Sequence, residues 1–199
     1  MKKNKGKKLY SFGESFLHLL KAFVTINYLS KAKKNKTISV IFQERIMLAV
    51  TEVNGCALCS YAHTKMALEA GLPKEEITQL LQGSNQENTP KDELNAILFS
   101  SYYAECRANV DKTIWDKIVK EYGKEKALGI LGAIRIITMG NVYGIALGSF
   151  VSRFKKDKSK RDKRTTLFYE IVTLLTFIPF TIIALLVSFI LRLFKVTLI

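Results

Sequence analysis

The chain has 199 residues, of which 48% are apolar, and its 31 Lys and Arg against 17 Asp and Glu give a formal net charge of +14. This composition excludes a disordered chain, and only three Cys exclude a secreted miniprotein held together by disulfides. The length fits one compact domain with or without an appendage, and the charge predicts an anionic partner, either nucleic acid or an acidic membrane surface.

Apolar residues recur every three or four positions along most of the chain, the spacing of amphipathic helices, and capping residues and glycines mark their ends. Seven helices are predicted before the most apolar segment, at 11–29, 37–54, 56–70, a short helix opened by Pro73, then 90–107, 111–122 and 124–154, with a polar loop at 83–89. The sequence lacks period-two alternation and βαβ patterning, so the predicted fold class is all-α.

The seventh of these helices needs separate consideration, because residues 136–152 carry no charge and Gly140, Gly144 and Gly148 repeat every four positions. Small residues at this spacing let helices approach closely, in membranes or in tight soluble packing. We expect a buried core or oligomer-interface helix. The alternative, a second membrane span, would place the basic N-terminal part outside the cell, against the positive-inside rule.

The C-terminal segment has the length and composition of a membrane anchor. No residue from Ile171 to Leu191 is charged, and as a helix this run would measure about 31 Å, close to the thickness of a hydrocarbon core. Eight Lys and Arg lie in residues 153–164, whereas Arg192 and Lys195 follow the run. This asymmetry predicts a single-pass anchor in the cell membrane with the N-terminal domain in the cytoplasm and the basic cluster at the anionic leaflet.

The sequence gives little support for export from the cell or for nucleic-acid binding. Glu14, His18 and Lys21 interrupt what would be the apolar region of a signal peptide, so the cysteines are expected in a reducing cytosol. We find no zinc-finger spacing, RNP-type aromatic string or recognition helix, so no nucleic-acid partner is predicted.

The residues that carry chemistry lie in one short stretch. Cys56, Cys59 and His63 are spaced three and four apart, so a helix beginning at Cys56 would place all three on one face. The free N–H groups and positive end of that helix would favour thiolates, the reactive form of cysteine, and the imidazole one turn on could exchange a proton. Glu44, twelve positions before Cys56 on the preceding helix, could orient His63.

These four residues match a family pattern: a Glu, eleven residues, Cys-x-x-Cys, three residues and a His. On this basis the chain resembles the AhpD-like superfamily of carboxymuconolactone decarboxylases and alkyl hydroperoxidase D proteins. The residues at 67–76 (ALEAGLPKEE) also look like the family's continuation, and the resemblance covers roughly 39–152. It implies an all-helical fold that forms homo-oligomers, often trimers or hexamers, and a dithiol peroxidase or disulfide-reductase activity that a thiol reductant system would sustain.

The resemblance also implies roles for the four residues. Cys59 would attack a hydroperoxide and pass through a sulfenic acid, Cys56 would resolve it to a disulfide, and His63 with Glu44 would relay the proton. No cofactor or metal is implied. Leu58 stands where peroxidases of this type often carry His, which argues against efficient peroxidase turnover but not against dithiol chemistry. The decarboxylase members lack the Cys pair, so lactone decarboxylation is not expected.

Three alternatives remain open. The cysteines could be inert core residues, or the fold could be a membrane-anchored scaffold without catalysis. A zinc site could use Cys56, Cys59 and His63 with the remote Cys106, although this is not a standard spacing. Cys106 is otherwise expected to be a free thiol and His18 an ordinary helix-face residue, while Tyr61 and Asn141 are candidates for lining the site.

The predicted organisation has four parts: a basic N-terminal segment and helix at 1–36, an AhpD-like helical domain at 37–152, a polybasic juxtamembrane linker at 153–166 and a transmembrane anchor at 167–199. The membrane location favours lipid hydroperoxides or membrane-associated redox partners as substrates.

Overall fold

The computed structural model describes residues 9–83, 89–155, 161–194 and 196–198. Within these ranges the chain forms α-helices and no strand, which confirms the all-α fold class. The helices are α1 (Phe12–Lys34), α2 (Val40–Asn54), α3 (Ala57–Glu69), α4 (Lys74–Gln82), α5 (Lys91–Glu105), α6 (Lys112–Tyr122), α7 (Lys124–Arg153) and α8 (Leu167–Leu193). The N-terminal lysine cluster, most of the predicted polar loop, residues 156–160 of the linker and Lys195 lie outside the described residues.

Local sequence signals set most helix boundaries. Ser11 and Glu14 form a capping box at the start of α1, and Ser39 caps α2. Gly55 ends α2 with a φ of 68°, a left-handed conformation that glycine adopts without strain. The first helix runs past its predicted end at Leu29 to Lys34, because Leu29 and Ala32 bury their side chains against α7.

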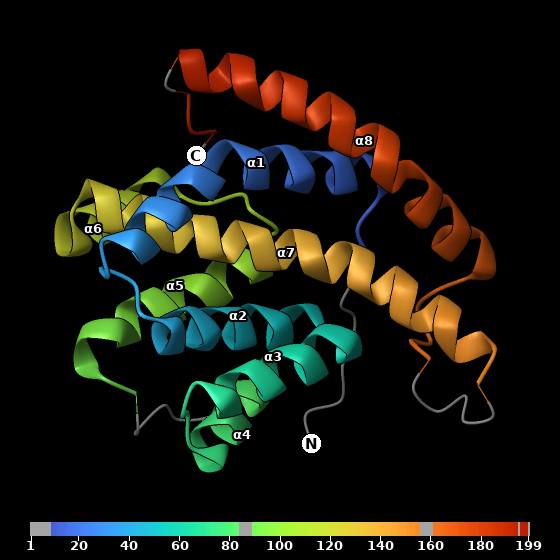
Figure 1. The fold of residues 1–199 in the computed structure, drawn as a ribbon, viewed down its shortest axis with the longest axis horizontal. Coiled ribbons are helices and arrows are strands. Elements are labelled where there is room, and N and C mark those ends of the chain that lie inside the picture. The colour runs from blue at the N-terminus through green and yellow to red at the C-terminus, as the bar shows by residue number, and fades with distance from the viewer. Residues whose placement is uncertain (1–8, 84–88, 156–160, 195, 199) are drawn as a thin grey trace.

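Helix α7 is the central element and is packed against α1, α2, α3, α5, α6 and α8 (Figure 1). Its closest neighbour is α1. A Cβ on Gly129 would lie 2.7 Å from Cβ of Ala32, and one on Gly132 would lie 3.0 Å from Cβ of Leu29. The most apolar 18-residue window of α7 is 78% buried inside the protein. This helix is therefore the core helix that its glycines predicted, although its length and composition alone would also suit a membrane span.

A buried ion network fixes α2 against α4 and α5. Arg45 donates hydrogen bonds to Glu76 from Nε at 2.6 Å and to Glu93 from Nη1 at 2.8 Å. Arg45 and Glu76 are both buried. Because an unpaired buried charge is strongly unfavourable, each partner requires the others, and the network holds the helix that precedes the cysteine motif.

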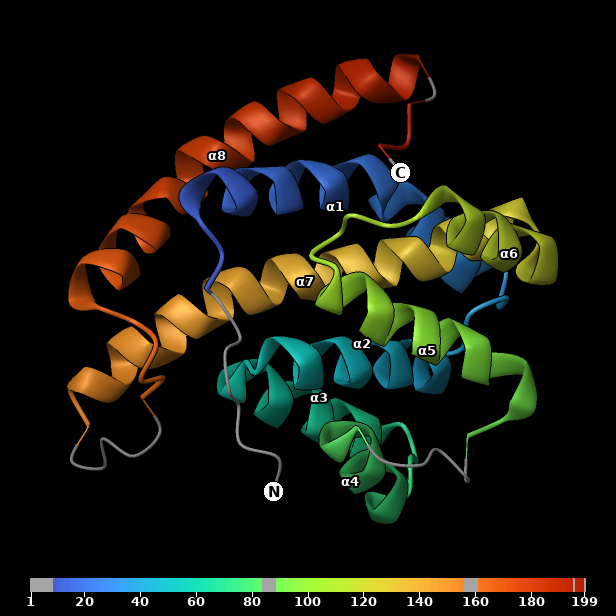
Figure 2. The same ribbon diagram turned by 180° about the vertical axis from the view of Figure 1, so that it is seen from behind.

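Helix α8 lies along the outside of the bundle, against α1 and the second half of α7 (Figures 1 and 2). Two helices of the described chain, α7 and α8, are long and apolar enough to cross a membrane, but the corresponding window of α8 is only 11% buried. A candidate membrane span is thus present at the C-terminal end.

His18 is buried on α1 rather than displayed on an open helix face. Its ring contacts Tyr10 edge-on at a centroid distance of 4.7 Å, and its Nδ1 finds no hydrogen-bond partner among the described residues. Removal from water, reinforced by the nearby Lys21 charge, lowers the pKa of His18 to about 4. The imidazole is therefore neutral in the folded protein at neutral pH.

The depressed pKa predicts a loss of stability in mild acid. Between the ordinary pKa of 6.5 and about 4, the unfolded chain binds a proton at His18 that the folded chain does not. The contribution of His18 is complete above pH 6.5 and is lost as the pH falls, by about 3 kcal/mol at most. Replacement His18→Gln should flatten this part of the pH profile, measured by urea unfolding in mild detergent between pH 7 and pH 4. His63 is unchanged in both proteins, so parallel profiles would show that His18 does not titrate as described.

Candidate active site

The cysteine motif opens α3 directly after the sharp turn that ends α2. Cys56 is the N-cap of α3, and its Sγ accepts a hydrogen bond of 3.2 Å from the backbone N–H of Cys59. The cap places this sulfur at the positive end of the helix, where unpaired N–H groups favour negative charge. When the pair is reduced, this position favours the thiolate of Cys56.

The two sulfurs are bonded to each other in a Cys56–Cys59 disulfide. Cys56 is 1% exposed and Cys59 is 8% exposed, so both sulfurs are shielded and Cys59 is the more open of the two. Of the cysteines, Cys106 at the end of α5 is free. The spacing of the motif correctly indicated a pair able to close to a disulfide.

His63 and Glu44 meet as the sequence predicted. Nδ1 of His63 lies 2.8 Å from Oε2 of Glu44, which joins α3 to α2 across a distance of 19 residues in sequence. The carboxylate side chain is 3% exposed and the imidazole 15% exposed. A hydrogen on Nδ1 that is donated to Glu44 leaves Nε2 to accept or donate the proton of a reaction, and fixes the orientation of the ring.

The backbone of helix α7 lies directly against the two sulfurs. Sγ of Cys59 lies 3.5 Å from the carbonyl oxygen of Gly140, and a Cβ on Gly144 would lie 2.6 Å from Sγ of Cys59 and 2.9 Å from Sγ of Cys56. One turn further, a Cβ on Gly148 would meet Cβ of Leu58 at 3.3 Å. The four-residue glycine period was visible in the sequence, but its partner, the cysteine helix, was not.

A second unexpected contact comes from the segment before α8. The guanidinium of Arg164 donates to the carbonyl oxygens of Asn54 at 3.4 Å and of Gly55 at 3.3 Å, the two residues just before Cys56. A cation at the C-terminal end of α2 complements the negative end of the helix dipole. The basic linker was recognised in the sequence only as a membrane-facing charge cluster, so this role was missed.

The two residues suggested as site linings differ in their surroundings. Tyr61 is 74% exposed and turned away from the core. Asn141 is buried beside Gly140 and accepts a hydrogen bond of 3.2 Å from Thr51 of α2. Asn141 therefore lies next to the part of the α7 backbone that contacts the sulfurs, whereas Tyr61 lies on the solvent-exposed side of α3.

The arrangement of the described residues does not gather ligands for zinc. Across the described ranges, no group of three or more His, Cys, Asp or Glu is placed to hold a metal ion. The fourth ligand of the zinc alternative, Cys106, follows α5, a helix outside this cluster. The site contains a disulfide, an imidazole and a carboxylate, which are groups suited to thiol redox chemistry.

Residues 18–84 match the model of the carboxymuconolactone decarboxylase family. The match begins within α1, earlier than the predicted start at Ser39, ends at the polar loop after α4, and contains Glu44, Cys56, Cys59 and His63. No curated protein and no solved structure matches the chain.

The close approach of Gly144 to the sulfurs predicts that two similar Gly→Ala substitutions in α7 will differ sharply in their effect on stability. Gly144→Ala would force a methyl group into the two sulfurs and should destabilise the protein by about 1–3 kcal/mol through overpacking. Gly140→Ala is the matched control, because its Cβ would meet only Cδ1 of Ile137 at 4.0 Å, so it should be neutral or slightly stabilising. Thermal unfolding of the oxidised proteins measures both; equal effects would contradict the close approach of α7.

Over residues 18–84, where the motif and the helices α2, α3 and α4 lie, the chain is similar to the carboxymuconolactone decarboxylase family, in agreement with the AhpD-like resemblance of its motif.

Proposed function

We propose that the protein is a dithiol oxidoreductase of AhpD-like type that reduces hydroperoxides or disulfides through Cys56 and Cys59. The observation that carries the proposal is the Cys pair at the N-terminus of α3 with His63 one turn further, held by the buried carboxylate of Glu44. The family match supports an enzymatic role, because the family includes enzymes.

The peroxidase cycle balances as follows. The thiolate of Cys59 attacks the terminal oxygen of a hydroperoxide, the O–O bond breaks, and the alkoxide takes a proton to leave as an alcohol, while Cys59 becomes a sulfenic acid. The thiol of Cys56 displaces the hydroxyl as water and forms the disulfide. A dithiol reductant then transfers two electrons and two protons by thiol–disulfide exchange, which restores both thiols. A disulfide substrate would enter by the same exchange in reverse.

His63 and Glu44 complete this scheme as the proton relay. Nε2 of His63 would take the proton from the attacking thiol and return it to the leaving alkoxide. Glu44 acts as a positioning residue, because it holds Nδ1 and thereby leaves Nε2 free for the proton. The greater exposure of Cys59 supports its assignment as the sulfur that meets substrate.

Substitution of the attacking cysteine tests the proposal directly. Cys59→Ser should abolish consumption of an alkyl hydroperoxide, whereas Cys56→Ser should consume about one equivalent and stop at the sulfenic acid. Peroxide loss and free-thiol counts on the pre-reduced proteins distinguish the two. Consumption of peroxide by Cys59→Ser at the wild-type rate would remove Cys59 from this role.

The relay is tested in the same assay by its pH profile. His63→Gln should lower the rate of thiolate attack by a factor on the order of 10² or more, and Glu44→Gln should lower it less and shift the pH at which activity appears. Tyr61→Phe is the control, because Tyr61 lies on the exposed side of α3. Wild-type rates and pH profiles in both relay variants would reject the relay.

We also propose that α8 attaches the protein to the cytoplasmic face of the cell membrane and that the protein forms homo-oligomers. Leu58, Met66 and Leu68 expose apolar surface on α3, which supports an oligomer contact near the site. The contact of Arg164 with the turn before Cys56 brings the start of α8 close to the site. Lipid hydroperoxides and membrane-associated redox partners are therefore the favoured substrates.

Membrane attachment has a simple biochemical test. In cells that express the full chain, the protein should remain in the membrane pellet after carbonate extraction. The double variant Leu186→Asp, Phe189→Asp, which places charges on the exposed face of α8, should move to the supernatant. Lys74→Asp, an exposed change on α4, is the matched control and should stay in the pellet. Release of the unmodified protein by carbonate would exclude the anchor.

A further inference from the structure

The residues of α8 that are fully buried against the bundle are polar or small, and partly buried apolar residues such as Phe180, Val187 and Leu191 flank them. The fully buried residues are Glu170, Thr173, Ala184 and Ser188. Aromatic side chains line the edges of this contact: Phe180 meets Phe16 of α1 at a ring distance of 5.4 Å, and Phe177 meets Tyr143 of α7 at 4.7 Å. The contact face is thus built for protein and not for lipid.

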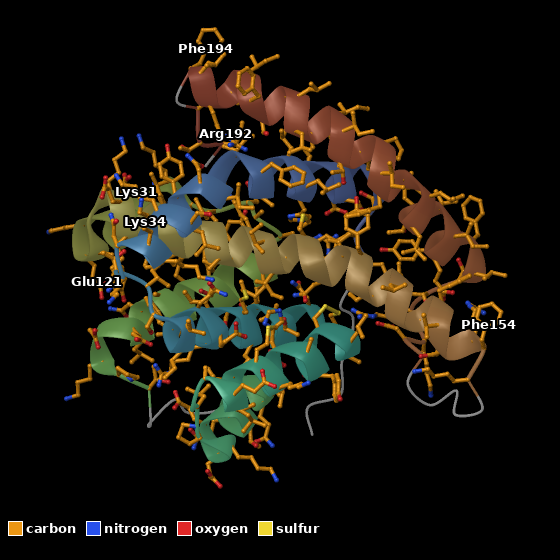
Figure 3. All side chains as sticks on the ribbon, in the orientation of Figure 1. Lys31, Lys34, Glu121, Phe154, Arg192 and Phe194 are labelled. Carbon is orange, nitrogen blue, oxygen red and sulfur yellow. A yellow bond between two sulfur atoms is a disulfide. The ribbon has the colours of Figure 1, made fainter. Side chains whose placement is uncertain are left out.

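A charged group holds each end of α8 to the bundle. Near the start, Glu170 accepts hydrogen bonds from Arg153 of α7 at 2.5 and 2.9 Å and from Thr165 at 2.7 Å, and its side chain is completely buried. Near the end, Nη2 of Arg192 donates to the carbonyl oxygen of Phe23 in α1 at 2.5 Å. Figure 3 shows Arg192 pointing from α8 toward α1.

The segment that follows α8 returns to the protein. Arg135 of α7, one of the largest fully buried side chains, donates from Nη1 to the carbonyl oxygen of Thr197 at 2.8 Å and from Nη2 to that of Leu198 at 2.7 Å. Its Nε donates to the hydroxyl of Tyr103 at 3.1 Å. Two of the three hydrogen bonds of this buried guanidinium therefore depend on the position of the chain after α8.

The opposite face of α8 is apolar from end to end. Large exposed side chains cover it, and Phe194 points away from the body of the protein (Figure 3). The exposed set on this face includes Phe168, Leu175, Ile178, Ile182, Leu186 and Phe189. Exposed lysines flank this face: Lys155 and Lys163 precede the helix, and Lys34 lies at the end of the neighbouring α1, where Lys31 pairs with Glu125. An apolar ridge between basic ends is complementary to one leaflet with anionic headgroups.

These contacts distinguish an α8 that crosses the bilayer from an α8 that lies in one leaflet. To cross the membrane, α8 would have to leave α1 and α7, which would expose Glu170, Thr173 and Ser188 to lipid and remove the carbonyl partners of Arg135. If α8 instead took α1 with it, Glu14 and Lys21 would enter the hydrocarbon. Each route is costly, because polar groups in lipid require partners. An α8 that lies in one leaflet keeps every contact.

We infer that α8 is an in-plane membrane helix: it stays docked on α1 and α7, its outer face enters the acyl chains of a single anionic leaflet, and residues 196–198 remain on the same side of the membrane as the helical domain. This inference rests on the proposed membrane attachment and refines it, because the protein is held on one face of the bilayer without crossing it.

A cysteine placed after α8 tests the topology in cells that express the full chain. In a background in which Cys56, Cys59 and Cys106 are all replaced by Ser, Val196→Cys should react with a membrane-impermeant maleimide in inverted vesicles and not in intact cells, like the control Lys74→Cys on α4. Reaction of Val196→Cys in intact cells, or its protection in both preparations, would overturn the inference. Carbonate extraction of the same samples distinguishes this outcome from a failure of membrane attachment itself.

Cross-linking in the membrane tests the docking independently. In the same background, Phe16→Cys with Phe180→Cys should be joined by a short, flexible bismaleimide cross-linker, since the two side chains they replace are in contact. The matched pair Phe16→Cys with Leu186→Cys should not, because Leu186 lies on the outer face. Linked peptides are identified by mass spectrometry after proteolysis between the helices. Absence of the first link, or equal yields of the two, would show that α8 leaves α1 in the bilayer.

Discussion

The architecture depends on how closely the backbone of α7 approaches the sulfurs of α3. Gly144 has no side chain, so the cysteine helix can rest directly on α7, and any Cβ there would overlap both sulfurs. Since α7 also packs against α1, α2 and α8, the same helix connects the disulfide, the Glu44–His63 pair and the apolar helix α8. The groups of the site are therefore held against the central helix α7, and this packing limits their movement.

Much of the fold and the centre of the site could be predicted because they depend on local spacing. Capping residues and helical periodicity located the helices, and the three- and four-residue intervals placed Cys56, Cys59 and His63 on one helix face. The meeting of Glu44 with His63 needed one further step, the packing of two successive helices. The start of the family match was not predicted: it lies inside α1, whereas the cysteine motif lies in α2 and α3.

The contacts that the sequence did not predict join residues far apart in the chain. Arg164 reaches Asn54 and Gly55 across 110 and 109 positions, and Arg45 ties Glu76 and Glu93 to α2. No periodicity or spacing encodes such pairs, since each depends on how whole helices cross. The placement of α8 along α1 was missed for a related reason: its outer residues have the composition of a membrane span, and only the buried Glu170, Thr173 and Ser188 reveal a protein-facing side.

The N-cap position of Cys56 has a consequence for the direction of electron flow. When a reductant attacks the more open Cys59, the bond breaks toward Cys56, whose sulfur already receives the N–H of Cys59 at the positive end of α3. A thiolate released there is a good leaving group and is stabilised once formed, which lowers the free energy of the reduced pair relative to the oxidised one. In the proposed cycle, this helix cap would therefore favour the transfer of electrons from other thiols to the Cys56–Cys59 disulfide.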